Sequence, residues 1–288
     1  MTETRTVTGR CLCGGVGWTA TGALTPLSHC HCSMCRKAHG AAFATYTQCA
    51  EDDLTWSGDP ALIADHRSSE DVNRRFCRQC GSTLPGTILS NGQMFLPMGA
   101  HENGSGLSGG EHIFTAAKLP WLEIGDRLPQ HDAYPAADSN FKTYDPAPPP
   151  ETDLPGLRGS CLCGTVRFVV RAEFSAIHNC HCTRCRRTRG AAFTTNGFVP
   201  DDAVTFLSGA DHVRRYNLPG AKVFAACFCD ICGGGVARID GFRGLANIPM
   251  AVLDDPAPRG PDDHIFTGSK ADWWEIPDDL PRFSEAPG

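Results

Sequence analysis

The stretch Cys30-His-Cys-Ser-Met-Cys-Arg36 decides the fold, and it returns at residues 180–186 as Cys-His-Cys-Thr-Arg-Cys-Arg. A Cys-x-Cys-Gly group precedes each copy, beginning at Cys11 and Cys161, and a Cys-x-x-Cys-Gly group follows it, beginning at Cys77 and Cys229. Seven cysteines in one order and spacing, present twice, are typical of metal ligands rather than of inert buried thiols. The sequence therefore predicts a tandem duplication of one small zinc-binding domain.

The repeat extends beyond the cysteines. Gly40-Ala-Ala-Phe43 recurs as Gly190-Ala-Ala-Phe193, and His112-Ile-Phe-Thr115 recurs as His264-Ile-Phe-Thr267. Between the copies lies a proline-rich run that predicts a stiff, extended linker. We predict a first domain at residues 1–145, a linker at 146–156 and a second domain at 157–288. The two repeats are expected to pack as a fused pseudo-dimer.

Local patterns indicate a mainly β fold. Short runs that alternate or carry β-branched and aromatic residues occur at 15–19, 54–56, 165–171 and 203–207. The 31 glycines and 21 prolines favour short strands and turns, and no long helical period is present. We therefore predict two tandem β domains, each stapled by zinc because its core is modest.

Charge and composition exclude several classes. The net charge is −6, and acidic residues outnumber basic ones in both halves, so neither half has the usual footprint of a nucleic-acid binder. No stretch approaches the ~20 apolar residues of a membrane span, and the first residues lack the apolar core of a secretory signal. We expect a cytoplasmic protein whose 16 cysteines stay reduced.

Seven cysteines per repeat divide into four and three. Zinc takes four protein ligands in a structural site and three in a reactive one. Cysteines two apart on a strand share a face, and a Cys-x-x-Cys turn presents both sulfurs to one metal. The predicted closed sites are Cys11, Cys13, Cys77 and Cys80, and Cys161, Cys163, Cys229 and Cys232. The predicted open sites are Cys30, Cys32 and Cys35, and Cys180, Cys182 and Cys185. Two zinc ions per repeat, four per chain, follow from this division.

Other polar and sulfur-bearing residues receive simpler interpretations. His31 and His181 are expected to support their clusters without binding zinc. Arg36 and Arg186, which follow the triple directly, are candidate contacts for a thiol substrate. Cys49 and Cys227 lack a counterpart in the other repeat and are expected in the core. The remaining repeated residues are expected to pack or pair strands: His112, Trp121, His264 and Trp273.

The ordered cysteine groups, with the later His-Ile-Phe and Trp, resemble the glutathione-dependent formaldehyde-activating enzyme family, which includes centromere protein V. The resemblance covers residues 9–125 and 159–277. It implies a β-tent fold and the same zinc division. It also implies a carbon–sulfur lyase that condenses glutathione with formaldehyde to S-(hydroxymethyl)glutathione, with the three-cysteine zinc as the reactive one. The family is usually a single domain, whereas this chain is doubled.

Three function classes follow from these observations. The first is a zinc-dependent carbon–sulfur lyase acting on a small-molecule thiol and an aldehyde, with no nucleic-acid or membrane partner. The second is a non-catalytic zinc module that binds a protein or another ligand. The third is a cysteine redox or metal-buffering protein. A substituted metal that changes its ligands when glutathione is added would favour the first.

Overall fold

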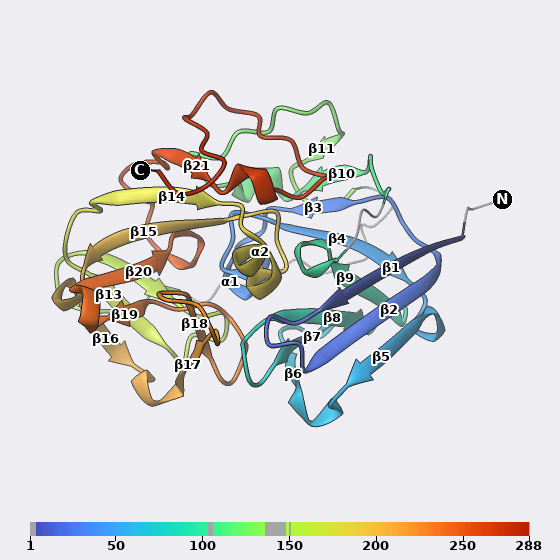
Figure 1. Cartoon of the computed structure of the whole chain (residues 1–288), viewed down its shortest axis with the longest axis horizontal. Coiled ribbons are helices and arrows are strands. Elements are labelled where there is room, and N and C mark those ends of the chain that lie inside the picture. The colour runs from blue at the N-terminus through green and yellow to red at the C-terminus, as the bar shows by residue number, and fades with distance from the viewer. Residues whose placement is uncertain (1–3, 103–105, 136–147, 150, 288) are drawn as a thin grey trace.

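The computed structural model describes residues 4–102, 106–135, 148–149 and 151–287. Its two halves are both mainly β and lie side by side, the first at the right and the second at the left of Figure 1. The predicted mainly β fold with cysteine clusters in each half is confirmed. Residues 146, 147 and 150 of the predicted linker lie outside the described residues, and the domain boundaries stay a prediction. No helix in the described ranges is long and apolar enough to cross a bilayer.

The first half contains a small and a large sheet. The small one has the order β1-β2-β5, formed by β1 (Thr4–Arg10), β2 (Val16–Ala23) and β5 (Leu54–Gly58). The large sheet has the order β11-β10-β3-β4-β9-β8-β7-β6. Its strands, in chain order, are β3 (Ser28–Cys30), β4 (Ala44–Cys49), β6 (Ile63–Arg67), β7 (Val72–Cys77), β8 (Thr83–Ile88), β9 (Gln93–Pro97), β10 (Glu111–Ile113) and β11 (Gln130–His131).

The second half divides the corresponding strands among three sheets, with the orders β12-β13-β16, β19-β20-β15-β14-β21 and β17-β18. Its strands are β12 (Leu157–Ser160), β13 (Arg167–Val170), β14 (Ala176–Cys180), β15 (Thr194–Pro200), β16 (Val204–Ser208), β17 (Val213–Asn217), β18 (Ala225–Cys229), β19 (Arg238–Asp240), β20 (Leu245–Pro249) and β21 (Asp263–Ile265). Where β7 pairs with β8 in the first half, β18 keeps an isolated bridge between Phe228 and Gly235.

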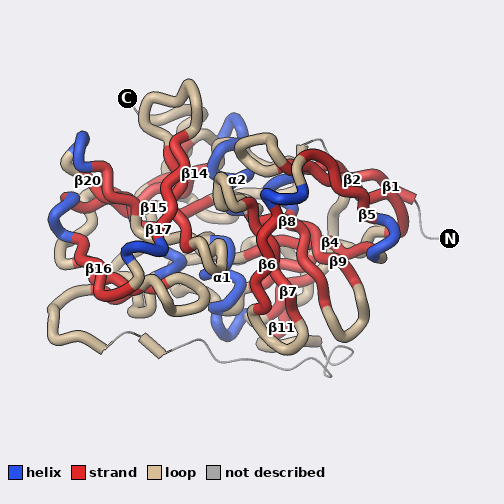
Figure 2. Tube along the Cα trace, turned by 90° about the horizontal axis from the view of Figure 1, so that it is seen from below, coloured by secondary structure: helices blue, strands red, loops and turns tan. Residues whose placement is uncertain are grey.

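Short 3-10 helices connect many of these strands, as the tube in Figure 2 shows. They are η1 (Glu51–Asp53), η2 (Pro60–Leu62), η3 (Met98–Ala100), η4 (Thr115–Ala117), η6 (Asp201–Ala203), η7 (Ala210–His212), η8 (Gly241–Arg243), η9 (Met250–Val252) and η10 (Thr267–Ser269). Separate apolar clusters form the cores of the two halves, one around Trp18 and Leu96 and the other around Phe168 and Ile248.

Two seven-residue α-helices, α1 (Ser33–His39) and α2 (Thr183–Arg189), lie at the centre of the molecule (Figure 1). Each begins after a cysteine, Cys32 or Cys182, whose sulfur accepts from a backbone N–H of the first turn. Each ends at a glycine in the left-handed conformation, which lacks the Cβ that would oppose it. The helices are thus as short as the sequence analysis, which found no long helical period, leads one to expect.

Each helix packs against the other half of the chain. α1 contacts η9 of the second half, and α2 contacts η3 and β8 of the first. The backbones approach so closely that a Cβ on Gly99, in η3, would lie 2.0 Å from the amide nitrogen of Ala191. Only glycine fits there, so the sequence at this position is set by contact between the repeats.

The contacts between the halves are reciprocal. A Cβ on Gly81 would lie 2.4 Å from the ring of Phe228, and a Cβ on Gly233 would lie 2.4 Å from the ring of Phe76. The rings of Phe43 and Phe193 meet edge to face, with centroids 5.7 Å apart. Because equivalent residues exchange places across the interface, the two repeats pack as a two-fold dimer would.

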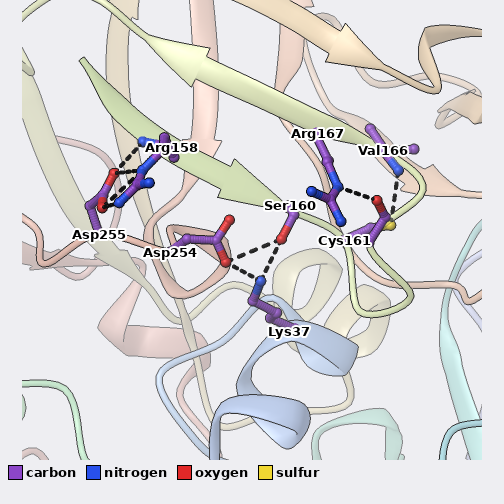
Figure 3. Close-up of polar contacts among 9 residues, drawn as sticks. Lys37, Arg158, Ser160, Cys161, Val166, Arg167, Asp254 and Asp255 are labelled. Atoms are coloured by element: carbon purple, nitrogen blue, oxygen red, sulfur yellow. Dashed lines mark hydrogen bonds and ion pairs between the residues drawn. The ribbon is translucent and has the colours of Figure 1, made fainter. Parts of the chain in front are cut away.

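A buried ion pair lies on one side of this interface (Figure 3). The ammonium of Lys37, in α1, donates to the carboxylate of Asp254 and, at 2.5 Å, to the hydroxyl of Ser160. On the opposite side the equivalent residues make a more exposed pair, in which Arg187 donates to Glu102 at 3.2 Å. The same contact is thus made twice with different burial.

Candidate metal centres

The four-cysteine clusters form as predicted in each half. The sulfurs of Cys11, Cys13, Cys77 and Cys80 all lie within 4.8 Å of one another, and so do those of Cys161, Cys163, Cys229 and Cys232. The Cys11 and Cys13 sulfurs are 3.3 Å apart, and Cys13 and Cys77 are 3.7 Å apart. Four sulfurs at ~2.3 Å from a tetrahedral zinc would be separated by about 3.8 Å. The donor set and its spacing therefore fit zinc.

The first pair of each cluster does not lie on a strand, which corrects the geometric argument made from the sequence. β1 ends at Arg10, and Cys11 to Gly14 form a turn closed by a hydrogen bond from the Gly14 amide to the Cys11 carbonyl. The turn still brings the sulfurs together. In both repeats a nearby backbone amide supports the first sulfur: the Val16 amide donates to Cys11 and the Val166 amide to Cys161, each at 3.3 Å. Figure 3 shows the second of these contacts.

The Cys-x-x-Cys turns match the expectation. Gly81 and Gly233, just after the second cysteine, both have φ of 71°. The Gly81 amide donates to the Cys77 carbonyl at 2.8 Å, and the Gly233 amide to the Cys229 carbonyl at 2.9 Å. A side chain at either glycine would be strained by the left-handed backbone and would also meet a phenylalanine of the other repeat.

The three-cysteine clusters also assemble. Cys30 ends β3, Cys32 precedes α1 and Cys35 lies in its first turn, and the three sulfurs lie within 4.8 Å of one another. The matching residues of the second half do the same: Cys180, Cys182 and Cys185. With three thiol donors each, these clusters fit a zinc ion that keeps one position for a further ligand.

A cavity opens onto the first of these clusters. Two aromatic side chains, Phe114 and Tyr134, line it and meet edge to face with centroids 4.7 Å apart. Phe114 has φ of 59°, an uncommon conformation for a bulky residue and one that proteins tend to keep at functional sites. The other lining residues are Cys30, Cys32, Met34, Cys35, Ser68, Ser69, Asp71, Val72 and Arg74.

Arg74, from β7, is buried beside the cluster and donates to it. Its Nη2 lies 3.4 Å from the Cys35 sulfur, its Nη1 lies 3.3 Å from the Tyr46 hydroxyl and its Nε lies 3.1 Å from the Ser68 hydroxyl. Burial alone would lower the pKa of Arg74, but the neighbouring Cys35 and Tyr46 raise it. The guanidinium is therefore held charged against the sulfur.

A neutral histidine continues this network across the interface. His39 is fully buried, and burial lowers its pKa to about 4. Its Nδ1 lies 2.5 Å from the carbonyl of Arg189, which can only accept, so Nδ1 carries the proton. Its Nε2 then accepts from the Tyr46 hydroxyl at 2.6 Å. The surroundings of the first three-cysteine cluster thus include the second repeat.

The second three-cysteine cluster lacks these neighbours. In the matching strand register, Ala226 takes the place of Arg74 and Asn196 the place of Tyr46. Its nearby arginines donate no hydrogen bond to a sulfur of the cluster among the described residues: Arg184 lies over the ring of Phe224 at 5.5 Å and interacts with Cys182 only through its charge, and the buried Arg189 interacts with Cys185 in the same way. Sequence reasoning did not single out Arg74; comparing the aligned repeats for a charged residue beside a cysteine group would have found it.

The histidines of the Cys-His-Cys motifs are not among the sulfur clusters, as expected. His31 Nε2 lies 2.9 Å from His112 Nδ1, and His112 Nε2 lies 3.0 Å from the carboxylate of Asp126. The second half repeats this chain through His181, His264 and Asp278 at 2.8 and 2.9 Å. His112 and His264 therefore do more than pack: they fix the imidazoles beside the clusters.

The remaining candidates fall as follows. Arg36 donates from Nε to the His31 carbonyl at 3.2 Å and does not line the cavity. The Nε of Arg186 is buried without a hydrogen-bond partner in the part of the chain that the structure describes. Cys49 and Cys227 are 1% and 4% exposed and belong to apolar clusters, as expected. Trp121 and Trp273 contact the apolar cluster between the halves.

Comparisons with known proteins show what the chain is similar to. The sequence profile of the family described as "Glutathione-dependent formaldehyde-activating enzyme" matches residues 6–117 and 156–269, more than half of the chain. A protein of Halomonas elongata with that provisional name is 30% identical over 130 residues, which is 42% of this chain and 80% of that protein. A Fusarium vanettenii protein with the same provisional name is 23% identical over 117 residues, 39% of this chain and 62% of its own.

A crystal structure of a Rhodobacter sphaeroides protein is also similar. It is 23% identical, with a TM-score of 0.28, and the match covers 35% of this chain and 92% of that one.

Proposed function

This chain belongs to the glutathione-dependent formaldehyde-activating enzyme family, and from that premise we propose that it is a zinc-dependent enzyme of the carbon–sulfur lyase type. It condenses a thiol such as glutathione with formaldehyde or another small aldehyde. The thiol sulfur forms a bond to the carbonyl carbon, the carbonyl π bond breaks, and the thiol proton ends on the new hydroxyl oxygen. No oxidant or further reactant is required.

The observation that carries the proposal is the contrast between the two kinds of cluster. The four-cysteine clusters hold a complete ligand set for zinc. The cluster of Cys30, Cys32 and Cys35 offers three donors and faces a cavity. A site with three protein ligands and access from outside has the arrangement of a reactive centre.

When bound there, zinc supplies a Lewis acid that stabilises thiolate and polarises carbonyl groups. The protein's own residues do the rest. Val72, Phe114 and Tyr134 narrow the cavity and limit water around the reacting atoms. The hydroxyls of Ser68 and Ser69 line the same space and can orient a carbonyl or hydroxymethyl oxygen. Condensation is then favoured by holding the two reactants together.

Several finer statements belong to this proposal. The six cysteines of the three-cysteine clusters act as reactive-zinc ligands, the eight of the four-cysteine clusters hold structural zinc, and the chain binds four zinc ions. Arg36 and Arg186, which follow the three-cysteine groups directly, contact a part of the thiol substrate that lies outside the cavity. All sixteen cysteines are free, which supports a reducing compartment such as the cytoplasm, where a reduced thiol substrate is also present.

Cobalt substitution tests the proposal. The absorption spectrum of the cobalt-loaded protein is recorded while glutathione is added, since d–d and charge-transfer bands distinguish three sulfur ligands from four. We expect part of the spectrum to begin as three-sulfur and move to four-sulfur. Formaldehyde is then added, and the condensation rate is compared with that of glutathione and formaldehyde in buffer.

Two outcomes count against the proposal. If every metal shows four sulfur ligands from the start and glutathione changes nothing, the chain is a closed zinc module. If glutathione binds but no aldehyde reacts faster with it than in buffer, the site binds thiols without catalysis, and reversible oxidation of the thiols becomes the next measurement.

A further inference from the structure

We infer that Arg74 is a positioning residue that lets the first three-cysteine cluster accept a thiolate, and that the second cluster, without its counterpart, is much the weaker thiolate site. The inference rests on the proposed function, since it concerns the thiol that this function uses. It assigns the two repeats different roles, although their cysteine groups are the same.

Only the first cluster, among the described residues, has a sulfur that accepts a hydrogen bond from a guanidinium group. Arg74 is 9% exposed, and its guanidinium donates to the Cys35 sulfur at 3.4 Å. Its two other nitrogens are engaged by Ser68 and Tyr46, so its orientation is fixed from both sides. A side chain held in this way cannot swing out to solvent when a ligand arrives.

Charge explains why this matters for a thiolate in particular. Three thiolates and one divalent zinc carry a net charge of −1, and a fourth thiolate would bring it to −2 in a buried setting. Arg74 offsets one of these charges, and its hydrogen bond withdraws electron density from the Cys35 sulfur. Both effects favour an incoming anion. Partners of this kind around metal ligands typically change affinity by ~10–100-fold.

The second repeat has more arginines on its helix, but none of them donates a hydrogen bond to a sulfur of its three-cysteine cluster. Among the described residues, the sulfurs of the cluster Cys180, Cys182 and Cys185 receive no guanidinium hydrogen bond. Ala226 stands where Arg74 would be. Arg189, at the position of His39, lies in the interface, where its carbonyl accepts from the His39 ring; its buried guanidinium interacts with Cys185 through its charge but donates no hydrogen bond to that sulfur. The second repeat therefore contributes to the first site as a support.

The test uses two full-length reporter proteins. Cys182→Ser disrupts the second three-cysteine cluster and leaves the first, and Cys32→Ser does the reverse. Each is loaded with Co²⁺ and titrated with glutathione, and cobalt affinity is measured by competition with a chelator. We expect the Cys182→Ser protein to bind glutathione at least ~10-fold more tightly than the Cys32→Ser protein.

Substitutions at Arg74 are then made in the Cys182→Ser protein. Arg74→Ala should weaken glutathione binding by ~10–100-fold and move the sulfur-to-cobalt charge-transfer band, and Arg74→Lys should recover part of the affinity because it keeps the charge. Arg75→Ala is the matched control: Arg75 lies in the same strand but pairs with Asp65 and Thr87. It should change neither property.

The results separate this inference from the proposed function. Equal glutathione affinity in the two reporters, or no effect of Arg74→Ala, overturns the inference while leaving a thiol-binding enzyme. If neither reporter binds glutathione, the proposed function fails. The action of Arg74 on the cluster is then tested by the charge-transfer band and the cobalt affinity alone. A band shift and weaker cobalt binding in Arg74→Ala but not Arg75→Ala would support its action on the cluster, and unchanged values would overturn it.

Discussion

The two repeats share their sulfur clusters and the histidine chains beside them, but differ in their sheet pairing and in the side chains around the three-cysteine clusters. In the first, β6, β7, β8 and β9 belong to one large sheet, while in the second β17 and β18 form a separate pair. Both nevertheless bring four sulfurs of two distant groups within 4.8 Å. The comparison teaches that the cysteine groups, rather than a continuous sheet, define the domain, as expected where a metal supplies much of the folding free energy.

The interface between the repeats shows that a contact made by both copies can diverge. Lys37 and Asp254 are buried, with side chains 7% and 3% exposed, whereas Arg187 and Glu102 are 25% and 32% exposed. In a symmetric dimer of identical chains, both copies of a contact are made by the same residues. A fused chain is free to let the two copies diverge, and this one has done so in its contacts as well as in its three-cysteine sites.

The largest expected effect would show whether both halves depend on their four-cysteine clusters. Cys77→Ser and the equivalent Cys229→Ser each remove one ligand, and we expect either to destabilise its half by several kcal/mol, because structural zinc contributes much of the stability of small domains. Thermal unfolding and zinc content measure this. Cys32→Ser, in an open cluster, is the control and should cost far less stability. Equal losses in all three proteins would contradict the division into structural and reactive clusters.

The second effect sharpens the contrast at the interface. Lys37→Met leaves the Asp254 carboxylate buried without its cation, and breaking such a pair costs about 3–5 kcal/mol. Arg187→Met removes a more exposed pair worth about 0–1 kcal/mol, and Glu102 keeps Arg10 as a partner. Denaturant unfolding compares the two.

A double variant shows whether the stability lost by Lys37→Met comes from an unpaired buried charge or from altered packing. Lys37→Met with Asp254→Leu removes both charges and should recover most of the stability lost by Lys37→Met alone. If the double variant is as unstable as the single one, packing rather than charge accounts for the loss at this position.

A third effect concerns the loss of folding stability at acidic pH. The folded pKa of His39 is about 4, below its ordinary value of 6.5 because of burial, so the unfolded chain binds the proton first. The contribution of His39 to the free energy of unfolding is therefore complete above pH 6.5 and is lost as the pH falls toward 4. About 2 kcal/mol should disappear between pH 7.5 and 5. The second repeat has Arg189 at this position and lacks this source of acid sensitivity.

The measurement compares the pH dependence of unfolding in the original protein and in His39→Gln, which should lose about 2 kcal/mol less over this interval. His131→Gln, at a partly exposed histidine that pairs with Glu111, is the matched control. Parallel curves for all three proteins would mean that His39 protonation does not limit acid stability.

The smallest effect tests a residue that the repeats do not share. Cys49 is buried in an apolar cluster, and Val199 fills the equivalent position. Cys49→Val should change stability by less than about 1.5 kcal/mol, because it keeps the volume and the apolar character of the site. Zinc content should stay the same; a loss of metal would show that Cys49 serves a cluster after all.

Much of this architecture could be predicted because the cysteines carry it in their spacing. The division into four and three followed from zinc's preference for four ligands, and the meeting of Cys77 and Cys80 at one site followed from their Cys-x-x-Cys spacing. The strand argument for Cys11 and Cys13 was wrong in its geometry, because their turn is closed by a local hydrogen bond that periodicity does not reveal.

By itself, then, the sequence determined which sulfurs gather, since those contacts depend on short segments and on the chemistry of one metal. Only the tertiary structure decided what surrounds each cluster. Arg74 reaches Cys35 from 39 positions away, and His39 is held by the carbonyl of Arg189, 150 positions away. Such partners depend on strand register and on the packing of two repeats. The guanidinium that touches a sulfur therefore lies in the first repeat, although the more basic helix, α2, lies in the second.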